Sequence, residues 1–243
     1  MAGRVEICNN DGVVIAESQQ AGGIIGSFEG GTVESCNNKG NIVSKYDLND
    51  ANNSGLVAGG ICGTMGNGTV KNCGNYGEVI AECQNAGGII GNMTNGTVEG
   101  CNNLNRVEVG VKNGPGIAGG IVAWQQNGVV QKCFNIGNVV NKNNNLTNSD
   151  ILGGISGYII KGTIKYSYSQ TNFEGGKTKG GVIGYVNTSY TQTIGNCFYS
   201  GELTRGIGNK ATDVAGKTDK IEELTDFDIF KQWITNKFPD LTF

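Results

Sequence analysis

Histidine is absent from the 243-residue sequence, and proline occurs only twice. Histidine is the commonest general base and metal ligand, so its absence excludes imidazole chemistry from any mechanism. The sequence also lacks a lysine or arginine run, and its formal net charge of −3 gives no electrostatic footprint for nucleic acid or an anionic membrane. No apolar run approaches the roughly 18 residues of a membrane-spanning helix, so we expect neither nucleic-acid binding nor membrane insertion.

Glycine, in contrast, is abundant, with 42 residues, and asparagine is frequent. Average glycine usage is about 7%, so the chain needs many turns and close backbone approaches. Pairs of glycines recur at intervals of 27 to 37 residues. The pairs begin at Gly22, Gly59, Gly87, Gly119, Gly153 and Gly180.

A cysteine marks the same place in most units, three residues after a β-branched residue. These cysteines are Cys8, Cys36, Cys73, Cys101, Cys133 and Cys197, and Ser167 takes the place in a further copy. An apolar residue stands six positions after each marker, and an asparagine stands two positions after the first five. Each unit holds three short apolar segments separated by Gly or Asn turns, and none reaches helical length.

Short strands repeated in register predict a solenoid in which each coil pairs with the next as parallel strands. We therefore expect an all-β fold, a right-handed parallel β-helix of about seven coils over residues 1–205, with a helical or irregular C-terminal cap over 206–243. A propeller or a sandwich is the alternative.

The stacking assigns a place to each column. The β-branched and cysteine columns are expected to fill a narrow interior, with reduced thiols acting as small hydrophobes because in-register Cβ vectors are unfavourable for disulfides. The asparagine column is expected in a left-handed turn with amides bonded along the stack. Cys62 and Cys83 fall outside the cysteine column and are predicted to be the exposed thiols.

Five short segments begin and end with glycine, and a GTVExCxNxGNV pattern follows them: Gly23–Gly26, Gly60–Gly63, Gly88–Gly91, Gly154–Gly157 and Gly181–Gly184. These segments resemble the GLUG motif of bacterial surface proteins, and the pattern that follows resembles the rest of that repeat. The resemblance runs from about Val5 to Leu203, although Ala123 replaces the last glycine of one copy. It implies an extracellular, cell-surface bacterial protein of adhesin-like type, and no catalytic residue in the repeat.

The ends and insertions break the pattern. Thr218 is predicted to cap a helix that covers the last coil, with Ile221, Leu224, Phe227, Phe230 and Ile234 toward one face.

The chain enters in mid-coil near Gly3. This favours an excised fragment over a first coil that docks on another molecule. Three longer insertions are predicted to leave one corner. Asp47-x-Asn49-Asp50-x-Asn52 in the first of them favours a polar loop over a calcium site, because the final Glu of an EF-hand loop is missing.

The outer columns carry the remaining candidates. The residues two before each marker form a mixed charge ladder without the tight carboxylate pair of a glycosidase, so we expect no catalysis. Trp124, Tyr158 and Tyr185 are predicted to stack outward on consecutive coils, and Tyr190 follows them; these four are the candidate binding residues. The neighbouring column of Ile25, Cys62, Ile90, Val122 and Ile183 is also assigned outward, which predicts that something covers it.

The sequence thus favours a non-enzymatic β-helix module of a bacterial surface protein, a stalk, adhesive or protein-interaction segment. A carbohydrate-binding module that uses the aromatic strip is the alternative, and a β-helix polysaccharide-degrading enzyme ranks third. We expect no cofactor and no metal. A host or bacterial surface protein or glycan, or self-association end to end or face to face, is the expected kind of partner.

Overall fold

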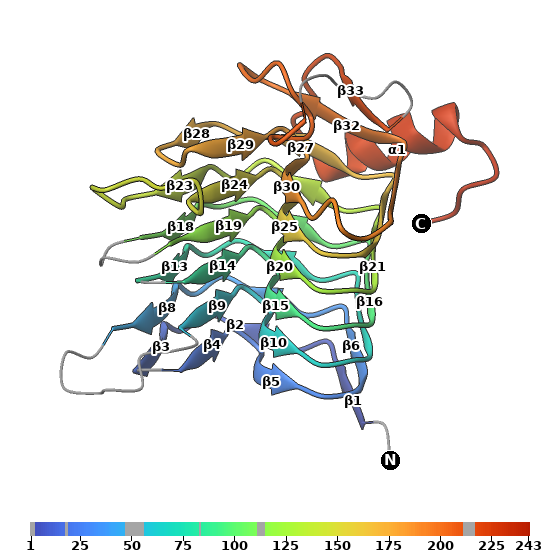
Figure 1. The fold of residues 1–243 in the computed structure, drawn as a ribbon. Coiled ribbons are helices and arrows are strands. Elements are labelled where there is room, and N and C mark those ends of the chain that lie inside the picture. The colour runs from blue at the N-terminus through green and yellow to red at the C-terminus, as the bar shows by residue number, and fades with distance from the viewer. Residues whose placement is uncertain (1–2, 18, 47–55, 83, 111–114, 211–216) are drawn as a thin grey trace.

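The computed structural model describes residues 3–17, 19–46, 56–82, 84–110, 115–210 and 217–243. Its strands climb in a parallel solenoid from the N-terminal to the C-terminal end (Figure 1). Strands β1 to β30 make six turns of five strands each, and β31 and β32 begin a further turn. The predicted parallel β-helix is confirmed.

Five parallel sheets, named A to E in chain order, run along the solenoid. Sheet A contains β1 (Gly3–Glu6), β6 (Gly31–Glu34), β11 (Thr69–Lys71), β16 (Thr97–Glu99), β21 (Val129–Gln131), β26 (Gly162–Lys165) and β31 (Gln192–Gly195). Sheet B contains β2 (Asn9–Asn10), β7 (Asn37–Asn38), β12 (Gly74–Asn75), β17 (Asn102–Asn103), β22 (Phe134–Asn135), β27 (Tyr168–Gln170), β32 (Cys197–Ser200) and β33 (Thr218–Lys220).

The other three sheets complete each turn. Sheet C contains β3 (Val14–Glu17), β8 (Ile42–Lys45), β13 (Val79–Ala81), β18 (Val107–Val109), β23 (Val139–Asn141) and β28 (Phe173–Glu174). Sheet D contains β4 (Gln20–Gly22), β9 (Val57–Gly59), β14 (Asn85–Gly87), β19 (Ile117–Gly119), β24 (Ile151–Gly153) and β29 (Thr178–Gly180). Sheet E contains β5 (Ile25–Phe28), β10 (Cys62–Met65), β15 (Ile90–Met93), β20 (Val122–Gln125), β25 (Ser156–Ile159) and β30 (Ile183–Val186).

Two apolar cores lie inside the turns. The larger joins the β-branched and cysteine columns, exemplified by Val70 and Cys73, to the sheet E column of Met65 and Met93. The smaller joins the column of Val79 on sheet C to an alanine column on sheet D. Small and β-branched residues fill both because stacked parallel strands leave a narrow interior.

The asparagine column forms the predicted amide ladder. Nδ2 of Asn38 donates to Oδ1 of Asn75 at 2.7 Å, Asn75 donates likewise to Asn103, and Asn103 to Asn135. Each amide also donates to a carbonyl two residues ahead, as Asn75 does to Gly77 at 2.8 Å. Because both donors are used inside the fold, the buried amides stabilise rather than penalise the structure.

The left-handed turn lies elsewhere than predicted. The residue immediately before each marker, not the asparagine, has positive φ, between 51° and 62° in every turn. These residues are Ile7, Ser35, Asn72, Gly100, Lys132, Tyr166 and Asn196. The corner between sheets A and B needs this conformation, whereas the asparagine acts through its side chain alone.

The glycine pairs mark the corner between sheets D and E. A Cβ atom on Gly60 would lie 2.1 Å from the Gly88 carbonyl oxygen and 2.5 Å from Cγ of Asn75. The corner therefore packs directly on the amide ladder, and no side chain fits there.

The C-terminal cap contains the one helix of the described residues, α1 (Phe227–Lys237). Asp226, not Thr218, caps it: the Asp226 carboxylate accepts hydrogen bonds from the backbone N–H groups of Asp228 and Ile229. Thr218 instead begins β33, paired in register with Cys197. A helix does form in this segment, as predicted, but it starts later. Before it, the chain adds strand β33 to sheet B, and β33 covers the edge of β32.

The insertions do leave one corner, between sheets C and D, after β8, β18 and β23. Asp47-x-Asn49-Asp50-x-Asn52 lies outside the described residues. In the last insertion the buried Asp150 accepts hydrogen bonds from the Gly116 N–H and the Asn141 side chain, which fixes the loop to the coil.

Candidate functional site

The predicted aromatic strip exists on sheet E. Trp124 pairs in register with Tyr158, and Tyr158 with Tyr185, so the three side chains project at the same place on successive coils. All three are half-buried, whereas their neighbours Gln125 and Ile159 are fully buried. The strip continues toward the N-terminus as the small polar residues Ser27, Thr64 and Asn92.

The rings of Tyr158 and Tyr185 stack face to face. Tyr158 and Tyr185 have centroids 5.2 Å apart and planes inclined by 4°, as in-register stacking of parallel strands dictates. The strip therefore presents ring edges and hydroxyls outward more than open ring faces.

The fourth candidate, Tyr190, lies in the turn that follows β30 and is 54% exposed. Asn187 in the same turn donates a hydrogen bond from Nδ2 to the Tyr158 hydroxyl at 3.2 Å, and its carbonyl oxygen accepts one from Gln192 at 2.6 Å. The turn that carries Tyr190 is thus anchored to the strip.

The neighbouring apolar column was assigned to the wrong face. Ile90, Val122 and Ile183 are buried in the larger core, and Cys62 is 0% exposed. The bend at Gly60–Ile61 restarts the alternation, so that Ile61 and Cys62 both point inward. Burial raises the pKa of the Cys62 thiol, which is a core side chain rather than an exposed one. Cys83 lies outside the described residues.

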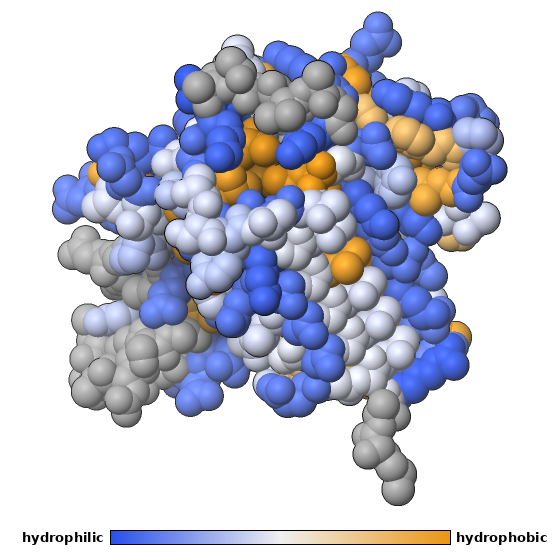
Figure 2. Space-filling model, turned by 45° about the vertical axis from the view of Figure 1, so that its right-hand side comes forward, coloured by the Kyte–Doolittle hydropathy of each residue, from blue (hydrophilic) through white to orange (hydrophobic). Residues whose placement is uncertain are grey.

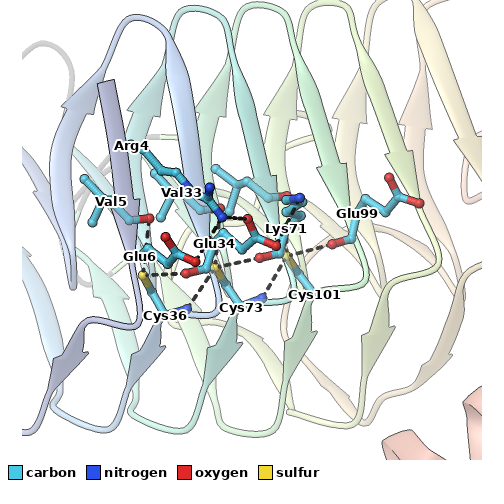
Figure 3. A network of polar contacts seen from close by, with 11 residues as sticks. Arg4, Val5, Glu6, Val33, Glu34, Cys36, Lys71, Cys73, Glu99 and Cys101 are labelled. Atoms are coloured by element: carbon cyan, nitrogen blue, oxygen red, sulfur yellow. Dashed lines mark hydrogen bonds and ion pairs between the residues drawn. The ribbon is translucent and has the colours of Figure 1, made fainter. Parts of the chain in front are cut away.

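The outer face of sheet A carries the expected charge ladder (Figure 3). Glu34 contacts Arg4 at 2.8 Å and Lys71 at 3.0 Å, and Glu99 contacts Lys132 at 2.7 Å. The hydrogen bond from Lys71 lowers the pKa of Glu34 despite partial desolvation. A carboxylate held ionised by two cations, as Glu34 is, is unsuited to donate a proton.

Behind the ladder, the cysteine column is a chain of weak hydrogen bonds (Figure 3). The Cys36 N–H donates to Sγ of Cys73 at 3.5 Å, and Sγ of Cys73 donates to the Lys71 carbonyl oxygen at 3.2 Å. The cysteines of the described residues form no disulfide. Burial raises the pKa of Cys133 and of Cys197 to about 12, which keeps these thiols protonated and unreactive.

A second aromatic column, on sheet B, escaped the sequence analysis. Phe134, Tyr168 and Phe198 follow the markers of the last three coils, in register, where earlier coils carry Asn or Gly. Helix α1 covers them with Phe230 and Ile234. The Tyr168 hydroxyl accepts a hydrogen bond from the Leu224 N–H at 2.9 Å. The change from Asn or Gly to aromatic residues after the markers was the sequence signal for this column. The C-terminal segment therefore covers an outer face of the solenoid, but it covers sheet B and not the predicted column on sheet E.

Apolar surface gathers toward the C-terminal end, as Figure 2 shows, while most of the other coloured surface in that view is pale or hydrophilic, with a few separate apolar spots. Within the described residues no group of three or more Asp, Glu or Cys side chains is placed to hold a metal ion. Helix α1, the one helix of the described residues, is not long and apolar enough to cross a membrane.

These features define a parallel β-solenoid with internal hydrogen-bonded ladders. No protein-family model matches the sequence, and a search of curated proteins returns no match.

Proposed function

We propose that the chain is a non-enzymatic β-helix module of a bacterial surface protein, which serves as a stiff stalk or interaction segment. The observation that carries the proposal is the continuity of the ladders. The amide ladder runs from Asn10 to Asn135 and passes to Thr171 through a bond of 2.7 Å. Bonds that run along the axis resist bending and extension of the rod, which suits a spacer.

The outer surface supports the same role. Its charged ladder on sheet A is paired internally, as Arg4, Glu34 and Lys71 show, and paired charges on a solvated face keep a rod soluble without a reactive centre. The GLUG-like segments favour an extracellular location, and the partner we expect is a surface protein or glycan.

Surface labelling tests the location. Antibodies raised against the purified chain should stain intact cells of the bacterium that encodes it, and external protease should remove the staining. Detection only after lysis would reject the proposal. Turnover of any polyuronide by the purified chain would overturn the non-enzymatic assignment.

The second candidate is a carbohydrate-binding module that uses Trp124, Tyr158, Tyr185 and Tyr190. Its support is the regular, half-exposed strip. The stacking of Tyr158 on Tyr185 leaves hydroxyls and ring edges for the ligand, so the strip favours hydrogen bonding along an extended chain over a flat sugar-stacking platform.

A glycan array separates the two candidates. Glycan binding by the wild type that Trp124→Ala and Tyr185→Phe weaken would support the second candidate. Tyr76→Ala is the matched control, because Tyr76 is an exposed tyrosine away from the strip. An array without any signal would leave the strip without a sugar-binding role.

A further inference from the structure

The smaller core ends in a lysine. Its sheet D column consists of Ala21, Ala58, Ala86, Ala118 and Leu152, all buried. Lys179 stands in register above Leu152, at the same place one coil later. A cation thus occupies an apolar core column where the core reaches the C-terminal end of the solenoid, and it is only half-exposed.

Two adjoining hollows open around this lysine, and together we name them the end pocket. The smaller, about 200 Å³, is lined by Phe173, Glu202 and Leu203 besides Lys179. The larger, about 360 Å³, shares Lys179 and Leu203 and adds Lys177 and Arg205. The lining of the end pocket therefore combines the apolar side chains of Phe173 and Leu203 with three cations.

The three cations of the end pocket differ from those of the charge ladder. On sheet A, Lys71 and Lys132 each contact a carboxylate. Lys177, Lys179 and Arg205 form no ion pair with any residue that the structure describes. Glu202 is the one carboxylate among the lining residues. Three cations against one anion make the lining of the end pocket positive, on a chain whose net charge is −3.

The wall that carries Arg205 is fixed. The Gly181 N–H donates to the Arg205 carbonyl oxygen at 2.8 Å, and the Ile183 N–H donates to that of Gly206 at 2.9 Å. The Asn209 side chain bonds both the N–H and the carbonyl oxygen of Val186, at 3.0 and 2.9 Å. A preorganised wall lowers the entropic cost of binding.

We propose that the end pocket binds an acidic saccharide through its carboxylate or sulfate groups. The oxyanions would pair with Lys177, Lys179 and Arg205. The sugar ring would offer its apolar face to Phe173 and Leu203 and its hydroxyls to Thr178 and Thr204, which also line the larger hollow. The proposal is independent of the proposed function, because no residue of the aromatic strip lines the end pocket.

Titration calorimetry at low salt tests it, with a sulfated heparin-derived hexasaccharide, an oligogalacturonate of equal length, a neutral cello-hexaose and poly-glutamate. We expect at least one of the two acidic saccharides to bind, and stronger binding of one identifies sulfate or carboxylate as the natural group. Lys179→Met should weaken binding at least 10-fold, and added salt should weaken wild-type binding. Lys45→Met is the matched control, because Lys45 is exposed on sheet C far from this end.

Arg205→Met repeats the test at a second cation of the end pocket, which is exposed and lies outside the strands. Circular dichroism establishes that each variant is folded. Absence of binding to both acidic saccharides, an unchanged affinity of Lys179→Met and Arg205→Met, or an equal loss in Lys45→Met would overturn the proposal. So would equal affinity for poly-glutamate or for the neutral hexaose.

Discussion

Replacing one amide of the asparagine ladder by a carboxylate tests how the solenoid is held together. In the native chain Asn75 donates two hydrogen bonds, to the Gly77 carbonyl oxygen at 2.8 Å and to Oδ1 of Asn103 at 2.7 Å. It accepts one from Asn38 at 2.7 Å. Asn75→Asp changes a single group, NH₂ to oxygen, and leaves the shape of the side chain intact.

The magnitude follows from the bonds lost. The carboxylate cannot donate, so two buried acceptors lose their partner at about 1 to 3 kcal/mol each, and desolvation of the charge adds to this. We expect Asn75→Asp to lose at least about 4 kcal/mol of unfolding free energy at pH 7. With a urea slope of about 2 to 3 kcal/mol per M, a loss of about 4 kcal/mol lowers the midpoint by about 1.3 to 2 M.

The loss should depend on pH in a defined direction. Burial beside two acceptors raises the folded-state pKa of the new carboxyl above its unfolded value of about 3.9. The penalty is therefore smallest below that value, where the protonated group still donates one bond, and it grows as pH rises toward the folded-state pKa. Asn75→Ala removes the same donors without a charge and should show no such dependence.

Urea unfolding followed by circular dichroism at pH 4 and pH 7 measures both effects. Asn67→Asp is the control for added charge, because Asn67 is exposed in the turn between sheets E and A. Equal midpoints for Asn75→Asp and Asn67→Asp at pH 7 would refute the reasoning, since the ladder would then contribute nothing measurable.

Three further predictions concern single side chains. Gln125→Met should raise the unfolding free energy in urea titrations by up to about 1 kcal/mol, because Oε1 of this 0% exposed glutamine has no partner in a column otherwise filled by Phe28, Met65, Met93, Ile159 and Val186. The substitution also removes the bonds that Nε2 donates to the Gly128 and Thr163 carbonyl oxygens, but the Gly128 oxygen keeps the Thr163 N–H as a donor; a loss of stability would contradict the prediction. Ile7→Asn should stabilise the folded chain by about 1 kcal/mol and raise its melting temperature, because Ile7 is a β-branched residue at φ 55° and is 71% exposed. The control Ile15→Asn, at an exposed residue of strand β3, should not raise the melting temperature. In a Cys83→Ser background at pH 8, Cys8 should be the thiol that reacts rapidly with dithiobisnitrobenzoate, because the other described cysteines are buried; fast labelling of Cys133 or Cys197 in the folded chain would show that the core is open.

Repetition made much of this fold predictable. Parallel strands stacked in register place equal positions of each unit above one another, so the alignment of Val70 with Val98 and of Asn75 with Asn103 already defined their columns. The same reasoning located the charge ladder and the strip of Trp124, Tyr158 and Tyr185. A column can be predicted without knowing how the rest of the chain folds, because each residue lies next to the residue at the same position of the neighbouring coil.

The corners and ends were decided by the tertiary structure. Strict alternation placed Cys62 outside, but the bend at Gly60–Ile61 turns two consecutive side chains inward. Thr218 has the residue type of a helix cap, yet it pairs with the open edge of β32, and the helix begins later, at Phe227, with Asp226 as its cap. Lys179 shows the same limit: the sequence alone determined the columns of the coil. Only the folded chain revealed that an apolar column ends in a cation that forms no ion pair with the described residues and lines a hollow with Leu203 and Arg205.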